Sequence, residues 1–79
     1  MNPWGLTATE QKVIATVCET GTDKGAARVI GMSNRTLEIH MHAVRKKMGV
    51  SNRVLAAILW DRFTREQAGN DSKGRRAGA

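Results

Sequence analysis

The chain has 79 residues, of which 41% are hydrophobic, and its 13 Lys and Arg against 7 Asp and Glu give a net charge of +6. A chain this short forms one small domain with a thin core and has little room for the deep pocket that catalysis needs, so we expect neither an enzyme nor a bound cofactor. The positive charge favours a polyanionic partner, although charge alone does not identify one.

The sequence contains no apolar run that approaches the roughly 18 residues of a membrane span. Its start also lacks the cationic and apolar segments of a signal peptide. We therefore expect a cytoplasmic protein that contacts no membrane. The single cysteine, Cys18, has no partner for an internal disulfide and follows apolar residues, so we expect a buried structural thiol.

A first helix is expected after a short arm, Met1 to Gly5, whose Trp4 should serve in packing. Thr7 and Glu10 form the Thr-x-x-Glu pattern of a capping box. Apolar residues follow at helical spacing, and Gly21 should end the helix in a left-handed conformation. The apolar face of this helix consists of Val13, Ile14 and Val17.

A second, short helix should begin after the cap residue Thr22, with Asp23 in its first turn. Gly25 is expected to weaken this helix by up to about 1 kcal/mol relative to alanine. Gly31 and Met32 then form a turn. The inner face of the helix would be small, which allows close approach of a neighbouring helix, and consists of Ala26, Ala27 and Ile30.

The third helix, expected over Asn34 to Met48, begins after the cap Ser33 and stops at Gly49. One face is apolar and should pack on the core, because its residues recur every three or four positions: Leu37, Met41, Val44 and Met48. The opposite side is mostly cationic and consists of Arg35, Glu38, Ile39, His42, Arg45 and Lys46. Between the two lie Thr36, His40, Ala43 and Lys47.

A fourth helix is expected from the cap residue Ser51 to about Glu66. Its apolar stripe is too wide to be covered by three short helices, so we expect one side to pack against a second copy of the chain. The residues of this stripe are Val54, Leu55, Ala56, Ala57, Ile58, Leu59, Trp60 and Phe63. Residues 67–79 are rich in Gly, Ala, Ser and charge, and we expect them to form a disordered basic tail.

Two short helices joined by a tight turn, the second with exposed cations, are typical of a helix-turn-helix. The segment from Ser33 to Arg53, SNRTLEIHMHAVRKKMGVSNR, resembles the signature of the LuxR/FixJ family of GerE-like DNA-binding domains. The residues that stand where that pattern expects them are Ser33, Thr36, His40, Lys47, Gly49, Val50 and Arg53, and Leu37, Val44 and Met48 fill its aliphatic positions. The opening GLTATEQKVI resembles the Leu-Thr-x-x-Glu start of the family, and Ala27 matches its second helix.

The resemblance covers about Gly5 to Phe63 and implies an all-α, four-helix domain over residues 5–66, with the third helix as recognition helix. It implies a transcription regulator that binds double-stranded DNA as a homodimer, with RNA polymerase or another regulator as a further partner. The residues expected to contact DNA are Arg35, Thr36, Glu38, Ile39, His42, Arg45, Lys46, Lys47 and Arg53. Those expected at the dimer interface are Val54, Leu55, Ile58, Leu59 and Arg62.

Other functions have less support from the sequence. Many relatives carry lysine at the position of Glu38, and this departure leaves open a protein-interaction adaptor or anti-activator built on the same scaffold; an RNA binder is a more distant alternative.

We expect no metal site, because His40 and His42 are two residues apart on a helix and point about 200° apart. We expect His40 to be buried and hydrogen-bonded, and His42 to face solvent. The start at Met1 and the tail favour a free-standing regulator over a fragment.

Overall fold

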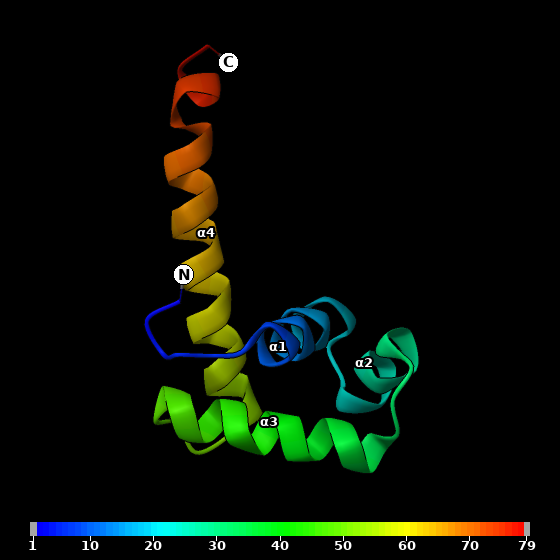
Figure 1. Ribbon diagram of the computed structural model, residues 1–79. Coiled ribbons are helices and arrows are strands. Elements are labelled where there is room, and N and C mark those ends of the chain that lie inside the picture. Colours follow the sequence, from blue (N-terminus) through cyan, green and yellow to red (C-terminus); the bar gives the residue numbers. More distant parts are fainter. Residues whose placement is uncertain (1, 79) are drawn as a thin grey trace.

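The computed structural model describes residues 2–78, with side chains described for residues 2–67. Four helices follow one another, α1 (Ala8–Thr20), α2 (Asp23–Ile30), α3 (Asn34–Met48) and α4 (Arg53–Gly78), and residues 2–78 contain no strand. Helix α1 contacts each of the other three helices, and α4 extends away from them (Figure 1). The predicted all-α, four-helix fold class is confirmed.

Side-chain caps and glycines place the boundaries of the first three helices where the sequence predicted them. In the capping box, the Glu10 N–H donates to Thr7 Oγ1 at 3.1 Å and the Thr7 N–H donates to Glu10 Oε1 at 2.9 Å. Thr22 and Ser33 cap α2 and α3 in the same way. These hydroxyls satisfy backbone donors that have no partner within the helix. The C-caps are glycines with left-handed backbone, Gly21, Gly31 and Gly49.

Helix α4 differs from the sequence-based expectation at both ends. Its first turn is capped by Asn52, whose Oδ1 accepts from the Leu55 N–H at 2.9 Å, so Ser51 was wrong as the cap. Asparagine and serine are about equally good N-caps, and the choice between neighbours depends on where the chain enters the helix. The helical backbone continues to Gly78, past Glu66. The tail expected to be disordered comprises residues 67–79. The side chains of residues 68–79 lie outside the described part of the structure.

The core is formed by the inner faces of all four helices. The whole predicted stripe of α3 is buried, as are Ala26 and Ala27 of α2. Cys18, which we expected to be buried, is only half-buried, because it borders a groove of about 380 Å³ between α1 and α4. Its Sγ lies 3.7 Å from the carbonyl oxygen of Ala57. Desolvation, together with the negative charge of Asp61, raises the pKa of the Cys18 thiol, which disfavours the reactive thiolate.

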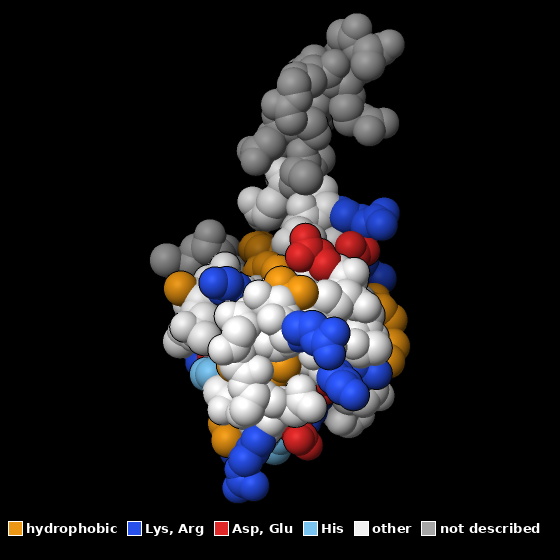
Figure 2. All heavy atoms as spheres, turned by 90° about the vertical axis from the view of Figure 1, so that its right-hand side faces the viewer, with side chains coloured by type: hydrophobic (Ala, Val, Ile, Leu, Met, Phe, Trp, Pro, Cys, Tyr) orange, Lys and Arg blue, Asp and Glu red, His pale blue; other side chains and the backbone are white. Residues whose placement is uncertain are grey.

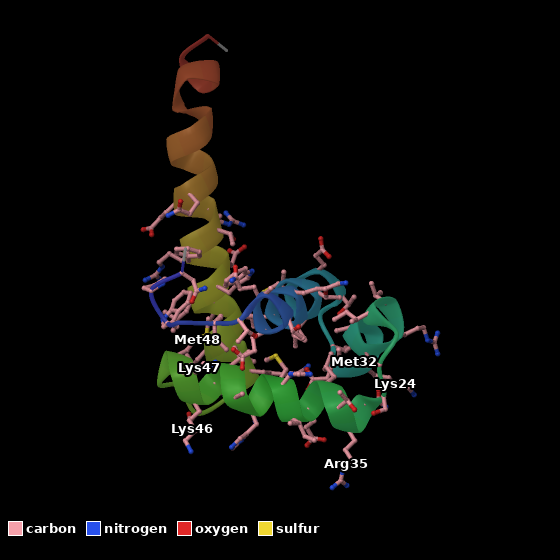
Figure 3. The ribbon with its side chains drawn as sticks, viewed as in Figure 1. Lys24, Met32, Arg35, Lys46, Lys47 and Met48 are labelled. Carbon is pink, nitrogen blue, oxygen red and sulfur yellow. The ribbon has the colours of Figure 1, made fainter. Side chains whose placement is uncertain are left out.

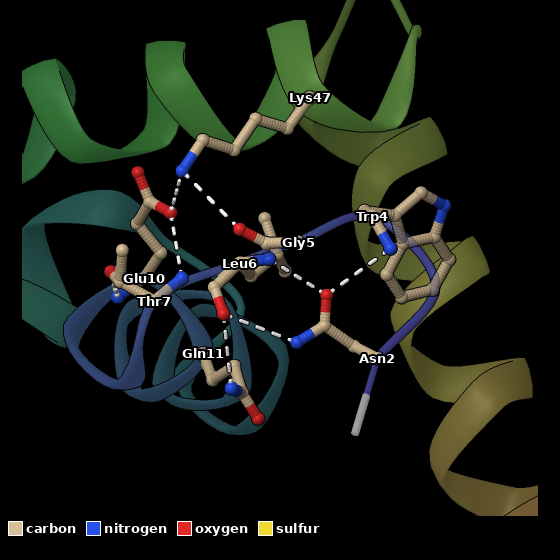
Figure 4. A network of polar contacts seen from close by, with 8 residues as sticks. All are labelled: Asn2, Trp4, Gly5, Leu6, Thr7, Glu10, Gln11 and Lys47. Atoms are coloured by element: carbon tan, nitrogen blue, oxygen red, sulfur yellow. Dashed lines mark hydrogen bonds and ion pairs between the residues drawn. The ribbon is translucent and has the colours of Figure 1, made fainter.

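The arm before α1 is part of the packed structure. Asn2 is buried, and its Oδ1 accepts from the backbone N–H groups of Leu6 at 2.7 Å and Trp4 at 3.2 Å (Figure 4). The Trp4 ring packs against Trp60 and Phe63 of α4, with ring centroids 6.4 and 5.4 Å apart. Packing therefore begins at Asn2, three residues before the expected domain boundary at Gly5.

Candidate functional site

Helix α3 presents a continuous exposed face opposite its buried stripe. This outward face of α3 consists of Arg35, Glu38, Ile39, His42 and Lys46, all of which are exposed. Ile39 leaves 60% of its surface exposed, although an isoleucine is among the residues most often buried. The expectation that His42 faces solvent is confirmed. The face thus offers cations, a carboxylate, an imidazole and an apolar side chain to a partner.

The position of α3 in the fold makes this face accessible. The turn between α2 and α3 is tight, since the Gly31 and Met32 N–H groups both donate to the Ala27 carbonyl, at 2.8 and 3.0 Å. Arg35 and Lys46 lie near opposite ends of α3 and point away from the other helices (Figure 3). Figure 2 shows Lys and Arg side chains at the lower tip of the molecule, where α3 lies, with acidic and histidine side chains beside them.

Lys47, unlike its neighbour Lys46, points back toward the body of the domain (Figure 3). Its Nζ donates to Glu10 Oε1 at 2.6 Å and to the Gly5 carbonyl at 3.5 Å (Figure 4). The carboxylate of Glu10 therefore both accepts the capping hydrogen bond at the start of α1 and forms an ion pair with Lys47 of α3. The hydrogen bond from Lys47, followed by that from the Thr7 N–H, lowers the pKa of Glu10, because both favour the charged form.

Arg53, a second residue of the expected DNA-binding set, also has a partner within the molecule. Its Nη1 lies 3.3 Å from Oδ1 of Asp23, so the ion pair joins the first turns of α2 and α4. The side chains keep 41% and 32% of their surface exposed, and an exposed pair of this kind contributes little stability. Arg53 is therefore held near the surface with its remaining donors available to another acceptor.

Three further α3 residues lie at the margins of the outward face. Arg45 is half-buried, and Thr36 is exposed with its hydroxyl accepting from Ser33 Oγ at 2.9 Å. His40 is half-buried and makes no hydrogen bond with the described residues, so the expectation of a buried, hydrogen-bonded ring was wrong. The reason is the small size of the domain, in which no helix covers that flank of α3 completely.

A comparison with protein-family models identifies the family of this domain. The model of the bacterial regulatory proteins of the luxR family matches residues 5–60. The chain belongs to this family. LuxR-family domains of this type are helix-turn-helix DNA-binding regulators, so the predicted resemblance is confirmed. No curated protein and no solved structure matches the chain significantly. No helix in the described residues has the length and apolar character that crossing a membrane requires.

Two exposed cations of α2 were not among the residues expected to contact DNA. Lys24 and Arg28 are exposed, lie four residues apart, and border a hollow of about 260 Å³ with Thr22 and Gly25. The alanine face of α2 indicated only a packing role for this helix, and the signal that could have revealed the two cations is their i, i+4 spacing away from that face.

The residues expected at the dimer interface of this LuxR-family domain do not all share one environment. Val54, Leu55 and Ile58 leave 60%, 43% and 49% of their surfaces exposed. Arg62 is exposed beside them, whereas Leu59 is half-buried against the core. The exposed apolar face of α4, defined here as Val54, Leu55 and Ile58, is therefore available to a partner, and Leu59 serves mainly the domain itself.

Proposed function

We propose that the chain is a sequence-specific transcription regulator that inserts α3 into the major groove of double-stranded DNA. The observation that carries this proposal is the outward face of α3, which is exposed over its length and opposite a fully buried stripe. The width of the major groove accommodates an α-helix. Because bacterial DNA lies in the cytoplasm, the proposal includes that location.

Phosphate contacts and base contacts are divided among different residues in this proposal. Cations with free side chains at the ends and edges of α3 set affinity and register, since phosphate contacts carry no sequence information directly: Arg35, Arg45 and Lys46. Glu38, Ile39 and His42 lie nearer the middle of the helix and contact base edges. Thr36, Lys47 and Arg53 complete the phosphate contacts, and Lys47 and Arg53 share their donors between a phosphate and Glu10 or Asp23.

A dimer is the second part of the proposal. Three adjacent apolar residues of α4 face solvent in the single chain, with Ile58 one turn after Val54. A two-fold pair of α4 helices would bury them and place two α3 helices about one turn of DNA apart, which requires a palindromic operator. The proposed contact with RNA polymerase or another regulator would use surfaces that DNA and the second copy leave free.

Selection from a random duplex library tests the DNA-binding proposal directly. We expect enrichment of a palindromic motif whose half-sites lie one helical turn apart. Single-stranded RNA and duplex RNA of the same sequence should compete poorly. A library that returns no motif, despite a folded protein, would remove the proposal.

The adaptor or anti-activator is the second candidate function, and one observation favours it. Glu38 makes no ion pair with any described residue and so places an uncompensated negative charge in a surface that would face phosphates. An adaptor would bind a protein through this face and would enrich no duplex from the library. The same selection therefore separates the two functions.

A further inference from the structure

Glu38 and Ile39 stand next to each other on the outward face of α3, and neither has a role inside the domain. Glu38 has no hydrogen bond or ion pair with the described residues, and Ile39 is 60% exposed. Together with Arg35 they line a shallow surface hollow of about 290 Å³. An apolar side chain and a carboxylate that the fold does not use are therefore presented side by side to the proposed partner.

The carboxylate restricts which base edge it can approach. An ionised Glu side chain only accepts hydrogen bonds, so it needs an amino group. In the major groove, adenine places its N7 acceptor beside its amino group, whereas cytosine offers its N4 amino group as the one polar group. A carboxylate is repelled by the adenine N7 and by both acceptors of guanine. Cytosine is the base that Glu38 fits.

Ile39 restricts the second base. The only apolar group that a base pair presents in the major groove is the C5 methyl of thymine. Contact with that methyl removes apolar surface of both groups from water, which is favourable. Polar base edges offer Ile39 no such gain and lose hydration when it covers them.

We propose that Glu38 accepts a hydrogen bond from the N4 amino group of a cytosine and that Ile39 packs on the C5 methyl of a thymine in the same half-site. This inference rests on the proposed function, and it goes beyond it by naming the two bases that this chain selects. The rest of the half-site depends on other contacts.

The test uses the full chain and the duplex that a random library selects. Replacing each thymine in turn by deoxyuridine removes only the methyl group and leaves base pairing intact. At one position per half-site we expect binding to weaken about fourfold, the effect of one buried methyl-sized group. The Ile39→Ala variant should bind the thymine and deoxyuridine duplexes with a ratio close to one.

The Glu38→Gln variant tests the other base. A glutamine amide both donates and accepts, and it pairs with the N6 and N7 groups of adenine. We expect the selected base at one position of each half-site to change from cytosine to adenine while the other positions stay the same. The matched control is Lys46→Ala, which should weaken all duplexes alike and leave the motif unchanged.

The possible outcomes separate this inference from the proposed function. A selected motif that tolerates deoxyuridine at every thymine, or that Glu38→Gln leaves unchanged, would overturn the base assignment and leave sequence-specific binding intact. A library that enriches no motif would overturn both.

Discussion

The ammonium group of Lys47 lies 2.6 Å from the carboxylate of Glu10, and this ion pair fastens the end of α3 to the start of α1. The Glu10 side chain keeps only 9% of its surface exposed, against 36% for Lys47. A buried carboxylate that lost this partner would keep only the hydrogen bond from the Thr7 N–H. A residue of the first helix cap therefore adds a polar contact to the apolar packing that positions the helix proposed to read DNA.

The first prediction concerns the pH dependence of stability. Because the folded state lowers the pKa of Glu10 below its ordinary value of 4.5, the unfolded chain binds this proton more readily. The stabilisation from Glu10 is thus complete above pH 4.5 and is lost as the pH falls through the lower, folded-state pKa. Urea unfolding from pH 7 to pH 3 should show this loss, and Glu10→Gln should reduce it. An equally steep decline in Glu10→Gln would assign the effect to other carboxylates.

The second prediction contrasts the neighbouring lysines of α3. Lys47→Ala should lower the free energy of unfolding by about 1 to 2 kcal/mol, because it removes a charged hydrogen bond from a buried carboxylate; the partial exposure of Lys47 keeps the value modest. Lys46→Ala should leave stability within about 0.5 kcal/mol, as is usual for exposed sites. Urea unfolding of both variants at pH 7 checks this difference.

On DNA, each of the two variants should flatten the salt dependence of binding by about one unit of slope and weaken all sequences alike. For Lys46→Ala the expectation follows directly from its outward side chain. For Lys47→Ala an unchanged slope would mean that its ammonium group serves Glu10 alone, and Lys47 would leave the set of phosphate contacts.

The third prediction concerns Gly25 in the first turn of α2. The sequence indicated only a helix-weakening residue, yet a Cβ at this position would lie 2.9 Å from Thr22 Oγ1, the atom that accepts from the Gly25 N–H to cap the helix. The gain in helix propensity from Gly25→Ala, up to about 1 kcal/mol, is therefore offset by loss of the cap, typically about 1 kcal/mol. We expect no stabilisation from Gly25→Ala.

A double-mutant cycle checks this explanation. In a Thr22→Ala background the cap oxygen is absent and only the 3.2 Å contact with Thr20 Cβ remains, so the same Gly25→Ala change should be more favourable than in the wild-type chain. Equal effects in both backgrounds would show that the contact with Thr22 does not matter.

Features set by neighbouring residues, such as helix bounds, could be predicted from the sequence. Contacts between residues far apart in the sequence could not. The capping hydroxyls and C-cap glycines act within one turn, so the bounds of α3 and its buried stripe followed from the sequence alone. The Glu10 to Lys47 pair spans 37 residues, and each partner already had a sufficient local explanation, as a cap residue or as a phosphate contact. The half-buried ring of His40 was missed for a related reason, since its burial depends on the packing of distant elements against α3.

The fourth prediction concerns the aromatic cluster formed by Trp4, Trp60 and Phe63, whose first and last members lie outside the matched residues 5–60. Trp4→Ala should lower the free energy of unfolding by about 2 kcal/mol, less than the 3 to 5 kcal/mol typical of a fully buried aromatic residue, because Trp4 is half-buried. Trp4→Phe should retain most of the stability. Thermal unfolding of the two variants, followed by circular dichroism, gives the comparison; equal losses would show that the arm contributes by something other than its ring.

The fifth prediction addresses the dimer and uses the two exposed apolar residues Ile58 and Val29, which leave 49% and 67% of their surfaces exposed on α4 and α2. If α4 forms the interface, Ile58→Asp places two charges near each other in an apolar contact and should yield a monomer that binds a palindrome with reduced affinity. Val29→Asp adds the same charge to an exposed apolar site on α2 and should remain dimeric. Sedimentation equilibrium with and without the selected duplex measures the oligomeric state of both variants.

A wild-type chain that sediments as a monomer in both conditions would contradict the proposed dimer. A dimer that survives Ile58→Asp would place the interface elsewhere than the exposed apolar face of α4.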